Sequence, residues 1–259
     1  MISFKKLLQN LVRTFHVLTS NKILPSNICI YFHETDLREI KAIENIILFF
    51  QFKGYEFKTI SEFNNDLSRN IKQVALTFDD GFSNWINLLP LFNKYSIKST
   101  FYLNSIFLTN DNLDEFLENI NFFKSSELIS KDEIIKIIDS NHEIGAHSHT
   151  HNTLSLLNEE QFKNDIEINL LHLSEYNNNI TSFAIPFGMR RYITKNQLNF
   201  LKNKFNVVCF GEPGMLFNQK NGSIQRTPWI IEKDFFYNLQ NITSNTSFFN
   251  RLTKRSGLG

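Results

Sequence analysis

The sequence contains 259 residues, 42% of them hydrophobic, and carries a formal net charge of +1. This length fits one α/β barrel-sized domain or two small domains with a sizeable core. The balanced charge argues against nucleic-acid binding, which needs a concentrated basic patch. The two cysteines, Cys29 and Cys209, lie in apolar runs and are expected to be buried hydrophobic residues rather than a disulfide framework.

Residues 1–25 are predicted to form an amphipathic helix. Its apolar face consists of Phe4, Leu7, Leu8, Leu11, Val12, Phe15 and Leu18. Gln9, Asn10 and Arg13 interrupt the apolar centre that a signal peptide needs. The sequence also contains no run of about 20 apolar residues, the length that is needed to span a bilayer. We expect this helix either to pack on the flank of the domain or to lie on a membrane surface, which places the protein in the cytoplasm or at the membrane periphery.

Apolar runs typical of buried strands then alternate with segments of helical apolar spacing. The predicted strands are residues 28–32, 55–59, 74–78, 99–103, 143–146, 182–185 and 206–210. The predicted helices are residues 37–52, 83–95, 134–139, 159–176 and 194–205. Candidate helix caps are Ser61, Ser130 with Glu133 as a capping box, and Asn158 at the N-terminal ends, and Gly54 at a C-terminal end.

This alternation predicts a mostly parallel sheet wrapped by helices. Residues 108–130 are polar and Asn-rich, and we expect them to form a loop or lid. Residues 26–259 contain no Pro- or Gly-rich linker and no internal repeat, so one domain is expected. Parallel strands place all their C-terminal ends on one rim, where polar residues that follow different strands would meet.

Asp79 and Asp80 follow the strand that ends at Phe78, and Gly81 follows them. Neighbouring residues of an extended backbone point in different directions, so one carboxylate could bind a metal while the other faces a reacting water. A solvated Asp-Asp-Gly turn is the simpler interpretation of this motif when it stands alone.

Four of the seven histidines lie between His142 and His151. His147 and His151 are four residues apart, which allows both to bind one metal ion. His149 points to another side and is expected to be incidental or to support the ligands, and His142 is expected to be structural. Two imidazoles and one carboxylate leave a coordination position open for water, which is typical of a hydrolytic site.

The motifs, taken in this order, closely resemble the signatures of the polysaccharide deacetylases, the chitooligosaccharide-deacetylase-like carbohydrate esterases. The matching segments are residues 77–81 (Thr-Phe-Asp-Asp-Gly), 143–151 (Glu-Ile-Gly-Ala-His-Ser-His-Thr-His) and 183–188 (Phe-Ala-Ile-Pro-Phe-Gly). The resemblance spans about residues 28–229. It implies a single-domain, distorted (β/α)7 barrel, one divalent metal ion that is usually zinc, and hydrolysis of an N-acetyl group from an amino sugar.

The resemblance also implies roles for individual residues. It makes Asp80, His147 and His151 the metal ligands and Asp79 the general base. The backbone N–H of Phe187 would help to hold the oxyanion. The neighbouring Pro186 belongs to the same predicted oxyanion and substrate region, to which we also assign Arg226.

The sequence departs from the family pattern in three places. Many relatives carry an arginine at the position of Ala184, where it orients the catalytic aspartate, and here Arg226 or Arg190 would substitute. The fourth motif, an acidic residue near a tryptophan, is not recognisable. The late Leu-x-His that supplies the general acid is absent.

Tyr31-Phe32-His33 resembles the start of the poly-N-acetylglucosamine deacetylase branch, in which the motif order is circularly permuted and an early histidine acts as the acid. The resemblance thus makes His33 the candidate general acid. The alternative is a histidine at a strand end that makes a structural hydrogen bond.

We therefore expect metal-dependent removal of an N-acyl group, in the first place N-acetyl, from an amino-sugar glycan or glycan precursor. One alternative is a deacylase or deformylase of a lipid-linked or small amino sugar, which the amphipathic N-terminus would suit. The other is an inactive carbohydrate-binding barrel, against which the intact set of Asp79, Asp80, His147 and His151 argues. Nucleotide binding and serine hydrolysis lack their glycine-rich and Gly-x-Ser-x-Gly motifs.

Overall fold

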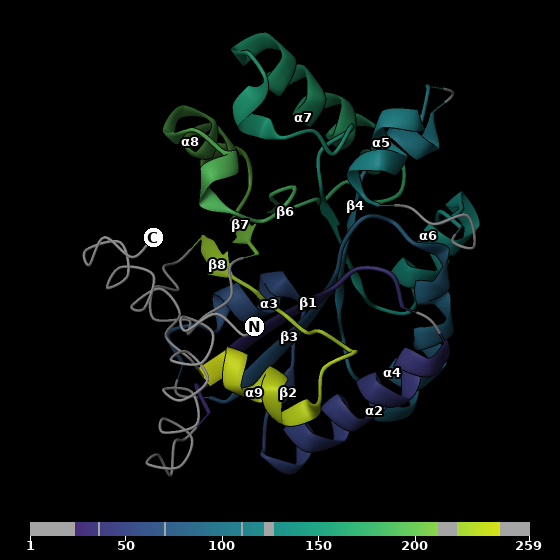
Figure 1. The fold of residues 1–259 in the computed structure, drawn as a ribbon, viewed down its shortest axis with the longest axis vertical. Helices are drawn as coiled ribbons and strands as arrows, with labels where there is room; N and C mark the ends of the chain where they lie inside the picture. The colour runs from purple at the N-terminus through teal and green to yellow at the C-terminus, as the bar shows by residue number, and fades with distance from the viewer. Residues whose placement is uncertain are drawn as a thin grey trace, which may run out of the picture.

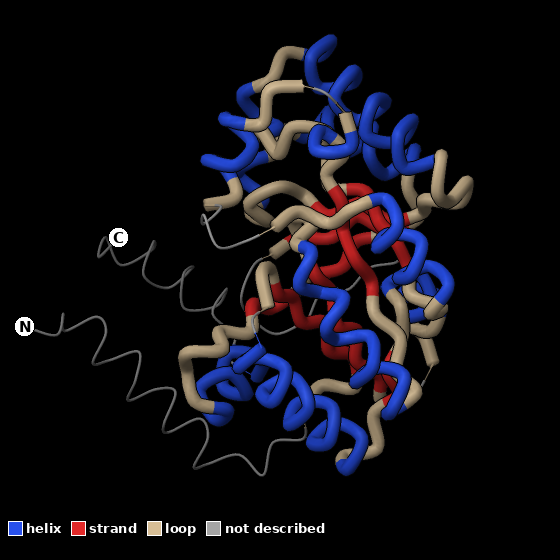
Figure 2. The backbone as a smooth tube through the Cα atoms, turned by 90° about the vertical axis from the view of Figure 1, so that its right-hand side faces the viewer, coloured by secondary structure: helices blue, strands red, loops and turns tan. Residues whose placement is uncertain are grey.

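The computed structural model describes residues 24–35, 37–69, 71–109, 111–121, 127–211 and 222–243. The strands gather in the middle of the molecule and the helices surround them (Figure 1 and Figure 2). The predicted amphipathic helix of residues 1–25 lies, but for its last two residues, outside the described part. None of the described helices is long and apolar enough to cross a membrane.

Parallel strands form one continuous sheet in the order β8-β7-β6-β5-β4-β3-β1-β9, and β2 pairs with the start of β3. The strands are β1 (Asn27–Phe32), β2 (Glu56–Phe57), β3 (Gln73–Phe78), β4 (Thr100–Leu103), β5 (Glu143–Ala146), β6 (Ser182–Ala184), β7 (Val207–Phe210), β8 (Ser223–Gln225) and β9 (Thr227–Pro228). The predicted (β/α)7-type barrel is confirmed.

One short segment, residues 223–228, brings the two edges of the sheet together. Its first half, β8, pairs with β7, and its second half, β9, pairs with β1. Arg226 stands between the halves, and its backbone N–H donates to the carbonyl of Phe210 at 2.8 Å. The sheet is therefore nearly closed into a barrel, and Arg226 lies at the seam.

The helical elements are α2 (Leu37–Phe52), α3 (Ile60–Asn65), η1 (Ser83–Leu88), α4 (Leu89–Tyr95), η2 (Ile106–Leu108), α5 (Asp114–Asn119), α6 (Lys131–Asp139), η3 (Leu154–Leu156), α7 (Glu159–Ser174), η4 (Arg190–Tyr192), α8 (Lys195–Lys204) and α9 (Phe235–Thr243). The predicted helix 37–52 and the capping box of Ser130 with Glu133 are confirmed.

Two local predictions were wrong. Thr59, not Ser61, caps α3, because the Thr59 side chain and Glu62 form a reciprocal capping box. Ser61 lies inside the helix, where its N–H and hydroxyl bind the carboxylate of Glu143. The polar stretch 108–130 is not all loop, since α5 forms within it.

Side chains of the strands alternate between the barrel interior and the layer beneath the helices. Small residues such as Cys29 and Ala75 face inward, and Tyr102 fills the space that they leave. Gly145 is required beside this ring, because a Cβ there would come within 2.3 Å of Tyr102.

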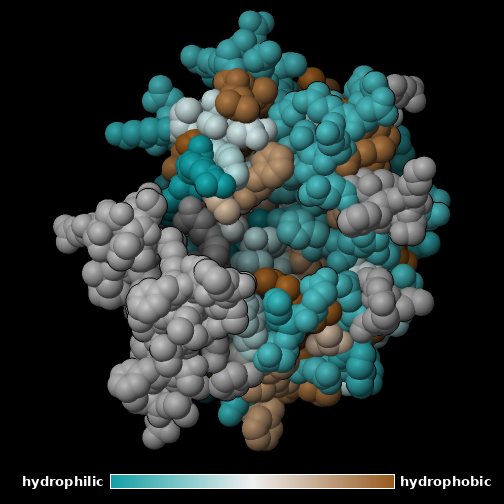
Figure 3. All heavy atoms as spheres, in the orientation of Figure 1, coloured by the Kyte–Doolittle hydropathy of each residue, from teal (hydrophilic) through white to brown (hydrophobic). Residues whose placement is uncertain are grey.

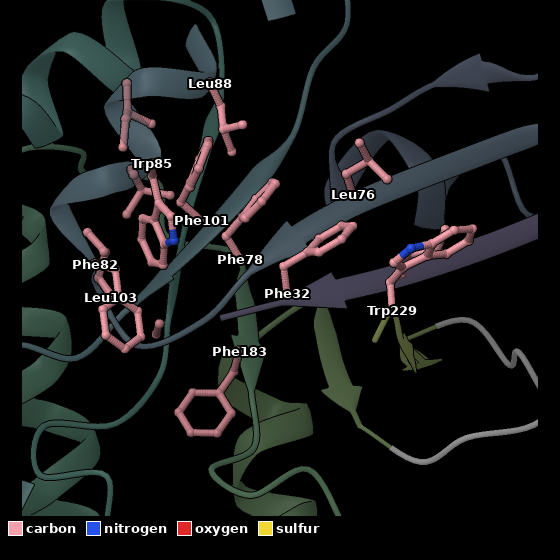
Figure 4. Packing of buried hydrophobic residues seen from close by; sticks show 14 of the residues in the cluster. Phe32, Leu76, Phe78, Phe82, Trp85, Leu88, Phe101, Leu103, Phe183 and Trp229 are labelled. Carbon is pink, nitrogen blue, oxygen red and sulfur yellow. The ribbon is translucent and has the colours of Figure 1, made fainter. Parts of the chain in front are cut away.

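Three phenylalanines on neighbouring strands stack outside the barrel (Figure 4). Phe32, Phe78 and Phe101 are register partners on β1, β3 and β4, with ring centroids 5.2 and 5.0 Å apart. Phe32 precedes His33 and Phe78 precedes Asp79. Because such cross-strand packing fixes the register of the strands, this stack fixes the positions at which His33 and Asp79 follow β1 and β3.

Candidate metal centre and active site

Asp80, His147 and His151 meet at the C-terminal rim of the barrel. Their donor atoms lie within 4.8 Å of one another, and no other such group of three occurs in the part of the chain that the structure describes. The Nε2 atoms of both histidines lie 3.3 Å from Oδ1 of Asp80. All three residues are buried, yet this oxygen has no hydrogen-bond partner of acceptable geometry. A cation between these atoms would satisfy an otherwise costly buried carboxylate, so the residues fit a metal ion.

The protonation states of the three side chains favour metal binding at two of them. Burial would raise the pKa of Asp80, but the charges of the neighbouring imidazoles hold it well below its usual value. Burial lowers the pKa of His151 to about 4, so this imidazole is neutral at pH 7. Burial acts to lower the pKa of His147, but the contact with Asp80, the charges of Asp79 and Asp80 and the contact with Ala184 together outweigh it, so the pKa is raised. A cation would have to displace that proton.

The tautomer of His147 is set by a second contact. Its Nδ1 lies 2.8 Å from the carbonyl oxygen of Ala184 at the end of β6, a group that can only accept a hydrogen bond. Nδ1 therefore carries a proton, and Nε2, which faces Asp80, is the nitrogen that could bind a cation once its own proton is displaced. Such an outer contact is typical of metal-binding histidines.

Several residues of the rim have a positive φ although they are not glycine. Asp80 has φ +84°, Ser148 +66°, His151 +57° and Phe187 +58°. This left-handed region disfavours side chains with a Cβ, and such strain clusters at functional sites. The surrounding structure thus forces two of the three candidate ligands into their orientation.

Arg226 clamps Asp79 inside the barrel mouth. Its Nη1 and Nη2 donate to Oδ1 and Oδ2 of Asp79 at 2.6 and 2.7 Å, and Nη1 also donates to Thr77. The guanidinium lies 5.0 Å from the ring centroids of both Tyr31 and Tyr102. Of the two arginines considered as substitutes for the one missing at position 184, Arg226 occupies the position beside Asp79.

His33 lies on the same rim and faces the metal-binding group. Its Nε2 is 4.0 Å from Oδ2 of Asp80, and its side chain is 56% exposed. The indole of Trp85 donates to its backbone carbonyl, and Tyr31 packs edge-on against its ring at 5.4 Å. The imidazole nitrogens make no hydrogen bond with another described residue that would mark a purely structural role.

A cleft of about 490 Å³ opens over these groups. Figure 3 shows this face of the molecule hollowed near its centre, beneath the helices that Figure 1 draws at the top. Besides the predicted residues, the lining includes Tyr31, Glu34, Asn119, Ile120, Asn121, Met189 and Tyr192. Apart from Tyr31, which belongs to the Tyr31-Phe32-His33 segment, no local motif marks these residues in the sequence, because only the fold brings their elements together at the cleft.

Phe187 borders the cleft, whereas the neighbouring Pro186 is buried and does not line it. Phe187 packs against His151 with ring centroids 4.7 Å apart. Its backbone N–H donates to no other described residue. The next residue, Gly188, has φ +72° and lies so close to Gly211 that a Cβ would come within 2.6 Å of its Cα.

The remaining histidines of the cluster point away from Asp80. His149 hydrogen-bonds Ser105 at 2.9 Å and stacks on His172 of α7. His142 accepts a hydrogen bond from the backbone N–H of Ser99 and packs against two phenylalanine rings. Neither belongs to the metal-binding group.

These features define a barrel with a candidate metal-dependent hydrolytic site, and sequence comparison agrees. The profile of the polysaccharide deacetylase family matches residues 66–205, slightly more than half of the chain. The chain belongs to the polysaccharide deacetylase family, whose members are hydrolases that act on carbon–nitrogen bonds other than peptide bonds.

One curated relative is similar to this chain in sequence, and two solved structures are similar to it in fold. A peptidoglycan-N-acetylglucosamine deacetylase of Bacillus cereus is 29% identical over 144 residues, which are 54% of this chain and 44% of the relative. The deacetylase PplD of Streptococcus pyogenes, solved with acetate, superposes with a TM-score of 0.66 at 17% identity over 83% of this chain and 97% of that one. The BpsB deacetylase domain of Bordetella bronchiseptica gives 0.59 at 12% identity over 80% and 97%.

Proposed function

We propose that this protein hydrolyses the N-acyl group, in the first place N-acetyl, of an amino sugar within a glycan. The observation that carries the proposal is a buried Asp80–His147–His151 group beside an arginine-clamped Asp79. Family membership supports N-deacetylation of a glycan. The names of the relatives, which include a peptidoglycan deacetylase, agree with an N-acetylated amino sugar as substrate.

The cleft suits a sugar in its chemistry. Phe187, Met189 and Tyr192 offer apolar and aromatic surface, on which the face of a pyranose ring can lie. Glu34 and the side chains of the loop around Asn119 offer polar groups for hydroxyls. A few placed polar groups on an apolar lining are the usual way in which a pocket fixes the orientation of its ligand.

Asp80, His147 and His151 would hold one divalent ion, with zinc as the expected metal. When bound, that ion supplies Lewis acidity to the amide carbonyl and to the attacking water. Asp79 takes a proton from that water, and the two hydrogen bonds from Arg226 fix the orientation of its carboxylate.

Two further groups complete the chemistry. The free backbone N–H of Phe187 donates to the developing oxyanion of the substrate. His33, exposed on the rim and outside the ligand group, donates a proton to the departing amine. An amine leaves poorly without that proton, so an acid at this place is needed.

The test is acetate release from N-acetylglucosamine oligomers by protein whose metal content is measured first. We expect about one divalent ion per chain, turnover that stops on chelation and returns with Zn²⁺, and loss of both metal and turnover in His147→Ala with His151→Ala. His172→Ala, a histidine substitution on α7 outside the metal-binding group, is the matched control and should retain both.

Sugar binding without acetate release, by protein that carries its metal, would overturn the proposal and favour an inactive carbohydrate-binding barrel. Release of formate from N-formyl sugars, with N-acetyl sugars left intact, would favour the deformylase alternative. Full metal content in the double histidine variant would rule out the metal site.

A further inference from the structure

The loop of residues 147–151 carries two of the three proposed ligands and is held in an unfavourable backbone conformation. Ser148 and His151 both have a positive φ. The Ser148 hydroxyl accepts a hydrogen bond from the backbone N–H of His151 at 3.0 Å. A loop of this shape needs further contacts, because two non-glycine residues in the left-handed region otherwise favour another conformation.

Asp165 of α7 supplies such contacts. Its Oδ2 accepts a hydrogen bond from the backbone N–H of His149 at 3.1 Å. Its Oδ1 accepts from the backbone N–H of Thr150 at 3.0 Å and from the Thr150 hydroxyl at 2.7 Å. All these bonds lie between the two ligands, so the carboxylate fixes the part of the chain that sets their separation.

The carbonyl oxygens of the same loop accept hydrogen bonds from Asn104, which follows β4. Asn104 donates through Nδ2 to the backbone carbonyls of His147 and Ser148, at 2.5 and 3.2 Å. Asp165 thus binds amide hydrogens of the loop while Asn104 binds its carbonyl oxygens. Two buried side chains therefore hold the loop, one by accepting hydrogen bonds and the other by donating them.

Asp165 is also unusual because it places a carboxylate on the buried face of α7. It is 6% exposed and shares the buried face of α7 with Phe162, Ile166, Asn169 and Leu173. Burying a carboxylate disfavours folding unless hydrogen bonds compensate for the lost water. No salt bridge to Asp165 occurs within the described ranges, and its hydrogen bonds there all go to the loop.

We propose that Asp165 is a positioning residue of the metal centre, which holds His147 and His151 at the separation that one ion requires. The inference rests on the proposed function for the existence of the metal site. Asp165 touches neither substrate nor metal, and acts only through the loop.

The experiment measures the affinity for Zn²⁺ of metal-free protein by competition with a chromophoric chelator, together with the melting temperature of the same metal-free protein. In Asp165→Asn, one acceptor oxygen becomes an N–H donor that faces another N–H. We expect the Kd for Zn²⁺ to rise about 10- to 100-fold, as is typical when an outer contact of a metal ligand is lost. The d–d spectrum of a Co²⁺-loaded sample should shift, which a general loss of stability would not cause.

The matched control is Gln197→Ala. Gln197 is equally buried, and it donates from α8 to the carbonyl of Leu154, outside the metal-binding loop. It should lower the melting temperature with an unchanged Kd. Thr150→Val removes only the hydroxyl contact to Asp165 and should raise the Kd several-fold, which keeps a test available if Asp165→Asn does not fold.

Wild-type Zn²⁺ affinity in Asp165→Asn or, where that variant fails to fold, in Thr150→Val would overturn the proposal. An equal rise in Kd for Gln197→Ala would do the same, because the effect would then be general. These outcomes are independent of turnover. A protein that releases no acetate but loses Zn²⁺ affinity in Asp165→Asn would refute the proposed function and uphold this inference.

Discussion

The contact between Arg226 and Asp79 allows a quantitative prediction about both stability and activity. Arg226 is 1% exposed and Asp79 is 3% exposed, so neither charge is solvated once its partner is removed. Breaking a buried ion pair by removing one partner costs about 3–5 kcal/mol. For a protein of this size each kcal/mol lowers Tm by about 2–4 °C, so Arg226→Met should melt about 6–20 °C lower.

A double-mutant cycle separates the ion pair from simple packing. Asp79→Asn combined with Arg226→Met contains no buried charge at this place, so it should be more stable than the sum of the two single variants predicts. Arg69→Met is the control, because Arg69 is 69% exposed and forms only a surface pair with Asp66. It should not change Tm measurably.

The same variant should also lose rate. Without the guanidinium, the two hydrogen bonds that orient the carboxylate of Asp79 are lost, so Arg226→Met should lower kcat while the metal content stays that of the wild type. Arg226→Lys keeps the charge but cannot bind both carboxylate oxygens, and should show a smaller loss. Melting like the wild type, strictly additive effects in the cycle, or an unchanged kcat would each refute the reasoning.

Three further outcomes are expected. Asp79→Asn should keep the metal and lose about 10²–10⁴ in rate, whereas Asp80→Asn should lose metal affinity; a metal-free Asp79→Asn protein would reverse the two roles. His33→Ala should be spared on aryl acetates, whose phenolate leaves without a proton, relative to N-acetyl sugars; equal losses would exclude His33 as the acid. Burial lowers the pKa of His142 from 6.5 to about 4, so its stabilising effect is present above pH 6.5 and lost as the pH falls through 4, worth about 3 kcal/mol. The loss of stability between pH 7 and pH 4, measured by urea unfolding, should be about 3 kcal/mol smaller in His142→Asn than in the wild type.

Local signals in the sequence predicted the elements that depend on local physics. The helix of residues 37–52 follows from apolar spacing, and the capping box of Ser130 with Glu133 from side-chain chemistry three residues apart. The cap of α3 was misplaced because Thr59 and Ser61 are both suitable residues, and only the contact between Ser61 and the distant Glu143 separates them. Strand ends predicted that Asp80, His147 and His151 would share a rim, and the structure brings them together.

Residues of the site that depend on long-range contacts could not be located in the same way. The sequence offered both Arg226 and Arg190 as substitutes for the missing arginine, and no local signal showed which of them lies beside Asp79. The choice depends on β8 and β9, which are three and two residues long and carry no periodic signal. Asp165 was equally hidden, since a single acidic residue in a helix is usually a solvated one.

The position of Arg226 ties the candidate chemistry to closure of the barrel. Arg226 stands between β8, which pairs with β7, and β9, which pairs with β1, so its backbone is fixed only when both edges are joined. Its side chain then reaches Asp79 at the end of β3, beside β1 in the sheet. An arginine on β6, as in many relatives, would approach from within the sheet. Here the contact that orients the proposed base depends on closure of the barrel. A variant that opens the seam should therefore lose the orientation of Asp79 while it keeps the metal-binding group, whose residues follow β3 and β5.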